Sequence, residues 1–171
     1  MMLLYIRLLA FWLAIGGLSN VACSHRGLAG SAQQGDQRKT ATERVQVASL
    51  RRTACFGSCP VFLAEVWSDG QVTWQGERHV ARLGHYTAQA PATWIAELLK
   101  EAEQSGFFRL GGHYPTNGRL VSDLPQTITM LRQNNKEYRV TDNADAPLGL
   151  LQFERYWQEK LEELSWNMVK Q

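Results

Sequence analysis

Two cysteines that lie close together, Cys55 and Cys59, constrain the fold more than any other feature of the sequence. Residues four apart in an extended strand are separated by about 13 Å, whereas a disulfide needs Cα atoms about 4.4 to 6.8 Å apart. A bond between the two sulfur atoms therefore requires a bend. Gly57 can adopt the positive φ of a sharp bend, and Pro60 disfavours helix at Cys59. The sequence predicts a turn closed by a short disulfide and followed by a strand that begins at Val61.

The same two thiols allow other interpretations. Thiol-disulfide exchangers usually place two cysteines two residues apart at a helix N-terminus, whereas here three residues separate them and a strand is expected to follow. Metal binding would combine the thiolates with two of the histidines at positions 79, 85 and 113, a spacing outside the common two-cysteine, two-histidine patterns. We predict a structural disulfide and expect no metal or cofactor, with a redox or metal site as the alternative.

The first 22 residues have the features of an export signal. Arg7 supplies a positive charge, and residues 8–18 form a short apolar core. This core is shorter than the roughly 18 to 20 residues that a membrane-spanning helix needs. We therefore predict a signal peptide at residues 1–22, with a single transmembrane anchor as the alternative.

The end of this signal is more specific. Val21-Ala22-Cys23 resembles the bacterial lipobox, in which a cysteine after small residues is lipidated and becomes the mature N-terminus. The resemblance implies lipidation of Cys23, and secretion after a nearby small residue is the alternative. Ser24 is not the aspartate that marks inner-membrane retention in enterobacterial lipoproteins. The implied location is the outer membrane, facing the periplasm.

Composition divides the rest of the chain in two. Residues 23–44 have almost no large apolar side chains, so we expect a flexible tether with a root-mean-square reach of about 25 Å. Residues 45–171 are long enough for a single domain. The formal charge of the chain is +2, and its basic residues are scattered, so nucleic acid is not expected as a partner.

Hydrophobic periodicity and turn residues predict two hairpins and two helices in this domain. The first hairpin turns at Asp69-Gly70 and the second at Asn134-Asn135. The helices are expected to begin near Pro91 and Pro147, with Gly106 ending the first. A further strand is expected across residues 79–86. Because hairpins favour antiparallel pairing, we predict an α+β domain in which an antiparallel sheet of about five or six strands packs two helices on one face.

A possible ligand or partner surface comprises Arg52, His113, Tyr114 and Asp123. The loop with His113 and Tyr114 carries aromatic and ionisable groups, which are typical of binding loops. Arg51 and Arg52 lie beside the cysteine turn and could hold an anion or a carboxylate-bearing partner, the alternatives being two solvated side chains or an ion pair of one of them with Asp123. Ser122, Asp123 and His113 are close only in sequence. We therefore predict no catalytic residue.

The segment Cys-Phe-Gly-Ser-Cys-Pro-Val at residues 55–61, followed by the Asp69-Gly70 hairpin, resembles a family of uncharacterised bacterial domains. These domains share a Cys-Phe-Gly-Thr/Ser-Cys-Pro signature and often follow lipoprotein signals. Asp123-Leu124-Pro125, leading into Thr127, resembles the second half of the family, and the resemblance covers roughly residues 46–160. It implies location and fold but no reaction.

The predicted function is a non-catalytic periplasmic lipoprotein domain that binds another envelope component. Its expected partners are the membrane, through the N-terminal lipid, and an envelope protein. The alternative is an envelope thiol-redox or metal-binding protein that uses Cys55 and Cys59.

Overall fold

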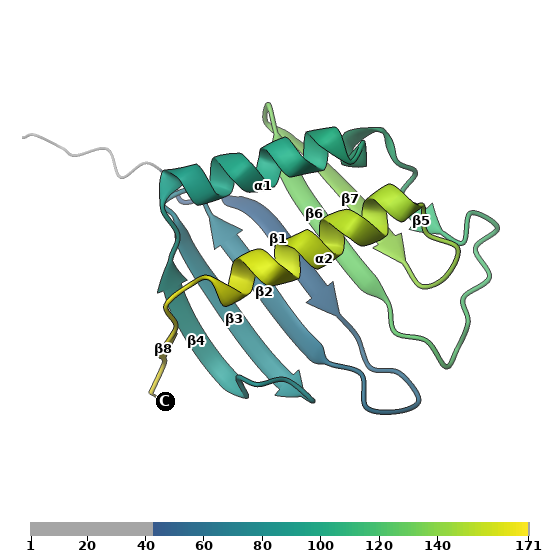
Figure 1. Ribbon diagram of the computed structural model, residues 1–171, viewed down its shortest axis with the longest axis horizontal. Coiled ribbons are helices and arrows are strands. Elements are labelled where there is room, and N and C mark those ends of the chain that lie inside the picture. The colour runs from purple at the N-terminus through teal and green to yellow at the C-terminus, as the bar shows by residue number, and fades with distance from the viewer. Residues whose placement is uncertain (1–42, 171) are drawn as a thin grey trace, which may run out of the picture. The chain divides into compact units, whose positions relative to one another are not determined.

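The computed structural model describes residues 43–170, in which a single sheet packs against two α-helices (Figure 1). The predicted signal peptide, the lipidation site Cys23 and nearly all of the predicted tether lie outside the described residues. Within residues 43–170, no helix is both long enough and apolar enough to cross a membrane.

Along the described chain, four strands precede the first α-helix, three lie between the two α-helices, and a short strand follows the second α-helix. The strands are β1 (Gln46–Arg52), β2 (Val61–Trp67), β3 (Gln71–Arg78), β4 (Gly84–Gln89), β5 (His113–Tyr114), β6 (Thr127–Gln133), β7 (Lys136–Asp142) and β8 (Asn167–Met168). The helices are α1 (Ala92–Gln104), the short 3-10 helix η1 (Phe107–Arg109) and α2 (Leu148–Glu162).

The order of strands across the sheet is β5-β7-β6-β1-β2-β3-β4-β8. β5 runs parallel to β7, and all other neighbouring strands are antiparallel. The fold class expected from the sequence is therefore wrong. In the described part of the chain the sheet is mixed and has eight strands, not an antiparallel sheet of five or six. The unexpected strands β5 and β8 are two residues long, too short to show a hydrophobic period.

Both predicted hairpins are confirmed, and turn residues explain them. Gly70 between β2 and β3 has φ 83°, and its N–H donates to the Trp67 carbonyl at 2.9 Å. Between β6 and β7, Asn134 and Asn135 have φ 50° and 60°. Positive φ at both central positions is the geometry that a type I′ hairpin turn requires.

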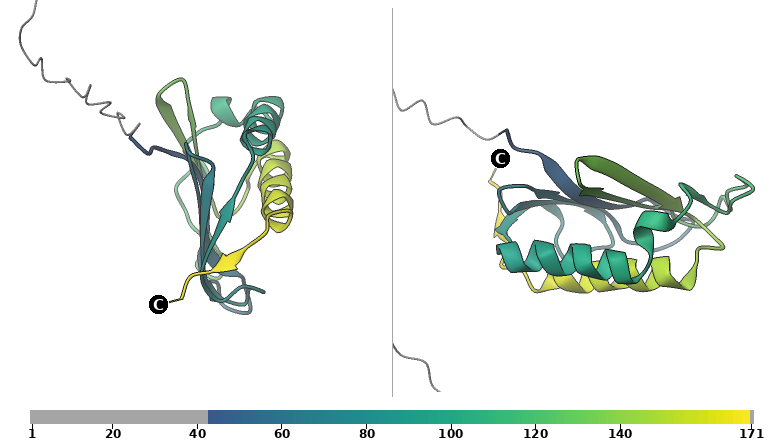
Figure 2. Two further views of the ribbon diagram at one scale, coloured as in Figure 1. Left: turned by 90° about the vertical axis from the view of Figure 1, so that its left-hand side faces the viewer. Right: turned by 90° about the horizontal axis from the view of Figure 1, so that it is seen from above.

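The helices bury one apolar stripe each. α1 begins after Pro91 and buries Trp94 and Leu98. Gly106, with φ 80°, follows its end. α2 begins after Pro147 and buries six side chains: Leu150, Phe153, Glu154, Trp157, Lys160 and Leu161. Figure 2 shows the two helices on the same side of the sheet.

The core lies between the helices and this side of the sheet. Alternate strand residues such as Leu50, Val66 and Leu131 point into it and are fully buried. The intervening residues point to the opposite face, which no described element covers and which we call the helix-free face. This alternation places Arg51 on the helix-free face and Arg52 on the helix side of β1.

Candidate functional site

The connection between β1 and β2 is a tight corner. The sulfur atoms of Cys55 and Cys59 lie at disulfide distance, with their Cα atoms 5.7 Å apart. Gly57 has φ 152°, a conformation that L side chains rarely adopt, and its N–H donates to the Cys55 carbonyl at 3.0 Å. The bend predicted from the cysteine spacing is confirmed.

Hydrogen bonds join this corner to the long loop between β5 and β6. The Phe56 N–H donates to the Asp123 carbonyl at 3.2 Å. The Thr53 N–H donates to the Gln126 carbonyl at 2.9 Å, and the Gln126 N–H donates back to Thr53 Oγ1 at 2.8 Å. The corner and the loop therefore present a joint surface.

Large apolar side chains are exposed on this joint surface. Phe56 is 90% exposed, and Leu120, Val121 and Leu124 are 55%, 45% and 44% exposed. We call these four residues the corner patch. Phe56 is next to the loop because its N–H bonds to the carbonyl of Asp123, which precedes Leu124, and large exposed apolar groups of this kind are typical of interaction sites.

Asn143, directly after β7, holds the loop in place. Its Oδ1 accepts from the Val121 N–H at 2.6 Å. Its Nδ2 donates to the carbonyls of Val121, Leu124 and Pro125 at 3.2, 3.1 and 3.1 Å. One side chain thus positions the loop half of the corner patch.

A second feature, a buried carboxyl pair, lies between α2 and the sheet near the same end of β1. Glu154 on α2 is 4% exposed, and Asp142 at the end of β7 is 7% exposed. Thr129 Oγ1 donates to Glu154 Oε1 at 2.8 Å. Arg52, at the end of β1, contributes a positive charge to the pair.

The protonation of this pair follows from burial. Burial, and then the negative charge of Asp142, raise the pKa of Glu154 from its usual 4.5 to about 8. Burial also raises the pKa of Asp142 above 3.8, but the hydrogen bond with Glu154 and the charge of Arg52 oppose that shift. The two carboxyls are hydrogen-bonded and titrate as a pair, and Glu154, with a pKa of about 8, holds a proton at neutral pH.

A cavity of about 300 Å³ adjoins the pair, and we call it the α2 pocket. Its lining residues are Arg52, Thr127, Asp142, Leu151, Glu154, Arg155 and Gln158. Among the described residues, Arg52 makes no ion pair within 4 Å with either carboxyl. Arg52 Nε and Asp142 Oδ1 are both buried without a hydrogen-bond partner there.

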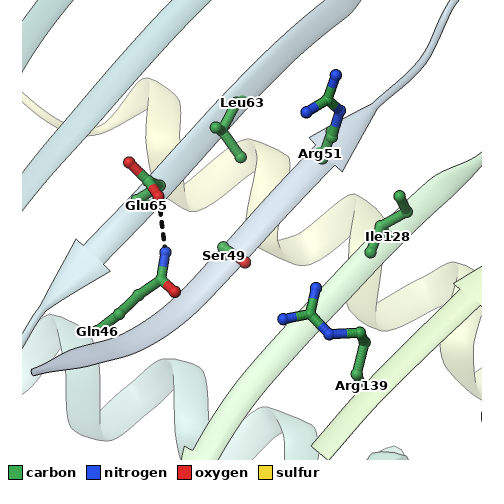
Figure 3. Close-up of a pocket in the computed structure, with 7 residues that line it drawn as sticks. All are labelled: Gln46, Ser49, Arg51, Leu63, Glu65, Ile128 and Arg139. Carbon is green, nitrogen blue, oxygen red and sulfur yellow. Dashed lines mark hydrogen bonds between the residues drawn. The ribbon is translucent and has the colours of Figure 1, made fainter.

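A third feature is a hollow of about 370 Å³ on the helix-free face, centred on the small side chain of Ser49 (Figure 3). On one side, Glu65 accepts hydrogen bonds from Gln46 Nε2 at 2.8 Å and Thr73 Oγ1 at 3.1 Å. On the other side, Arg139 extends from β7 over β6 toward β1.

Exposure distinguishes the hollow from the α2 pocket. Arg51 and Arg139 beside the hollow are exposed, so water can solvate their charges without a ligand. Asp142 in the α2 pocket is buried, and its Oδ1 has no hydrogen-bond partner in the described chain, which is costly for a buried polar atom. The α2 pocket is therefore the stronger candidate for a small-molecule site.

The four residues of the predicted surface lie in different places. Arg52 lines the α2 pocket, and Asp123 lies on the loop beside Phe56. His113 and Tyr114 form β5 at the edge of the sheet, where Tyr114 Oη accepts from the Gly111 N–H at 3.3 Å. Within residues 43–170, no hydrogen bond or ion pair joins any two of these four side chains, including Arg52 and Asp123.

The residues of the alternative chemistries are also dispersed. Ser122 Oγ donates to Asp123 Oδ1 at 3.4 Å, but no hydrogen bond from either to His113 is found in the described chain. His79 precedes β4, and His85 lies within it. Residues 43–170 contain no group of three or more histidine, cysteine or acidic side chains that could hold a metal ion.

Sequence reasoning missed Asp142, Asn143 and Glu154. Glu154 had a recognisable signal, because it is four residues after Leu150 and three before Trp157 on the buried stripe of α2. A charged residue on such a stripe is exceptional. Asp142 and Asn143 follow the last apolar residue of a strand, and nothing local distinguishes them from ordinary loop residues.

Comparison with known protein families assigns the described domain to a family. A family model described as a domain of unknown function, DUF6438, matches residues 46–161, more than half of the chain. No curated protein matches the sequence.

Proposed function

The chain belongs to the DUF6438 family of domains of unknown function, and from this premise we propose that it is a non-catalytic binding domain of the bacterial cell envelope. In this proposal a lipid on Cys23 anchors it to the outer membrane, facing the periplasm. The corner patch binds another envelope protein, and the disulfide between Cys55 and Cys59 has a structural role.

The observation that carries the proposal is the position of Phe56. Leaving a phenylalanine side chain in water forgoes about 1.5 to 3 kcal/mol relative to burying it. Phe56 is nevertheless 90% exposed, on a corner fixed by the disulfide. Because disulfide and hydrogen bonds already order the corner and its loop, a partner can bury the patch at a small cost in conformational entropy.

The corner patch and the point where the chain enters the domain lie at opposite ends of β1. The chain enters the domain at the start of β1, and the corner follows its other end (Figure 1). A strand of seven residues spans about 23 Å. The corner patch therefore lies about 23 Å from residue 46, where β1 begins.

Photo-crosslinking in native cells tests the partner. In one variant a photoreactive amino acid replaces Phe56. In the matched control it replaces Leu83, which is 58% exposed between β3 and β4. We expect a discrete adduct from position 56 and none from position 83, identified by mass spectrometry. Absence of an adduct at 56, or identical adducts at both positions, contradicts the proposal, and adducts with lipid alone would make the patch a membrane contact.

Thiol chemistry tests the role assigned to the cysteines. We expect protein prepared without reductant to show no free thiol from Cys55 and Cys59 and to resist mild reduction. A readily reduced bond, or stoichiometric zinc, would favour the alternative of an envelope thiol-redox or metal-binding protein.

Fractionation tests the anchor. Cys23→Ala should move the protein from the membrane fraction to the soluble fraction, because a lipidated cysteine is lost. An unchanged membrane association, or cytosolic wild-type protein, would exclude the proposed location.

A further inference from the structure

We propose that the α2 pocket binds a small zwitterion, an α-amino acid, whose carboxylate faces Arg52 and whose ammonium group faces Asp142. This site is separate from the corner patch and goes beyond the binding function proposed above.

The first argument is that the pocket contains opposite charges that do not pair with each other. Arg52 and Asp142 both line it, yet residues 43–170 provide no ion pair within 4 Å for Arg52. Asp142 is 7% exposed, and its Oδ1 lacks a hydrogen-bond partner. An ionised carboxylate in such a position is costly unless another group compensates its charge.

The second argument concerns what can compensate both residues together. An anion would satisfy Arg52 but repel Asp142. A cation would satisfy Asp142 but repel Arg52 and the second guanidinium, Arg155. A ligand with a carboxylate and an ammonium group offers an acceptor to the guanidinium side and donors to the carboxylate side, so it complements both.

The third argument is the composition of the remaining wall. Glu154, with a pKa of about 8, is protonated at neutral pH and adds no full negative charge to the pocket, whose other acidic lining residue is Asp142. Arg155 allows the ligand carboxylate to contact a second guanidinium, the residue type best suited to carboxylates. Leu151 is exposed at the rim and supplies an apolar surface for a ligand side chain.

Size sets the class of ligand. A volume of about 300 Å³ is at the lower end of the range of small-molecule pockets. This room suits a single amino acid. Exposed Leu151 and Arg155 on α2 leave one side of the pocket open to solvent, so a ligand can enter.

Titration of the purified domain with matched probes tests the charge requirement. The probes are L-leucine, acetate, methylammonium and glucose. Isothermal titration calorimetry and amide NMR chemical shifts measure the binding of each probe. We expect L-leucine to bind, acetate and methylammonium to bind at least tenfold more weakly, and glucose not to bind. Equal binding of acetate and L-leucine, or no response to L-leucine, overturns the proposal.

Substitutions locate the site. Arg52→Gln and Asp142→Asn should each weaken L-leucine binding at least tenfold. The matched control is Arg51→Gln, one residue away on the helix-free face, which should leave binding unchanged. If Asp142→Asn fails to fold, Arg155→Gln on the exposed rim should still weaken binding severalfold. Equal losses from Arg51→Gln and Arg52→Gln, or full binding by Arg155→Gln and Arg52→Gln, would refute the assignment.

Discussion

At the scale of single residues, Glu154 makes the stability of the protein depend on pH. Its pKa in the folded protein is about 8, above the usual 4.5, so the folded state keeps a proton that the unfolded state releases. The stabilisation is fully present below pH 4.5 and is lost as the pH rises toward 8. Each unit of pKa difference corresponds to about 1.4 kcal/mol.

We predict that Glu154→Gln flattens this dependence, because an amide has a similar shape and does not ionise. The free energy of unfolding of the wild type should fall between pH 5.5 and 8.5 by several kcal/mol more than that of Glu154→Gln. Urea denaturation at three pH values measures the difference. The control is Glu159→Gln, at an exposed position of the same helix, which should keep the wild-type dependence of stability on pH. If Glu154→Gln also kept that dependence, Glu154 would be ionised in the folded wild type over the whole pH range.

Residue-level chemistry also shows the limit of what the sequence predicts at the candidate site. Arg52, together with Arg51, could be singled out because it lies beside the cysteine corner. Its neighbours in the α2 pocket come from β7 and α2, far along the chain, and meet it only through sheet pairing and helix packing. Local sequence patterns do not specify such contacts.

At the scale of elements, one side chain, Asn143, makes four hydrogen bonds to the loop between β5 and β6. All four are with loop backbone, one with Asn143 as acceptor and three with it as donor. The loop residues from 116 to 124 are exposed and have little apolar packing of their own. The loop half of the corner patch should therefore lose its order when Asn143 is replaced.

We predict that Asn143→Ala lowers the free energy of unfolding by about 1 to 3 kcal/mol, since it leaves backbone groups without partners. Amide hydrogen exchange should rise in residues 116–126 and at Phe56, and remain unchanged in β2 and β3. Asn143→Asp keeps the oxygen that accepts from the Val121 N–H but removes the N–H groups that donate to the loop carbonyls. Amide exchange of the loop should therefore also rise in this variant. Unchanged exchange in both variants would mean that the loop is held by other contacts.

The contact between the two helices depends on a glycine at the start of α2. A Cβ on Gly149 would lie 2.7 Å from the Ser105 carbonyl oxygen, at the end of α1. Because that neighbour is backbone, one of the helices must shift. We predict that Gly149→Ala destabilises the protein by about 1 to 3 kcal/mol, measured by thermal unfolding. Gly111→Ala, whose Cβ would meet nothing closer than 3.9 Å, should be nearly neutral, and equal effects would contradict this steric explanation.

Elements with strong local signals were predictable, and elements defined by long-range pairing were not. The Asp69-Gly70 and Asn134-Asn135 turns and the start of α1 after Pro91 follow from local backbone preferences. β5 and β8 exist only because distant segments return to the edges of the sheet. Their absence from the prediction is why both the strand count and the purely antiparallel pairing were wrong.

At the scale of the whole molecule, the sheet extends past the region that the family model matches. That region ends at residue 161, whereas β8 lies at Asn167–Met168 and pairs with β4. Trp166, just before β8, packs edge-on against Trp74 at 6.0 Å, and its indole N–H donates to the Leu161 carbonyl at 3.0 Å. The C-terminal segment thus covers both the aromatic end of the core and part of the last long edge.

We predict that a chain ending at Ser165, which keeps the buried Leu164, folds but is less stable by about 1 to 3 kcal/mol, because it loses the Trp166 contacts and exposes Trp74. The uncovered edge of β4 should also promote self-association, since an unpaired strand edge pairs with other chains. Thermal unfolding and sedimentation velocity measure the two effects. The control is Met168→Ser with Val169→Ser, which changes only exposed side chains and keeps the backbone pairing with β4. A truncated chain that stays monomeric with unchanged stability would show that the family region alone completes the sheet.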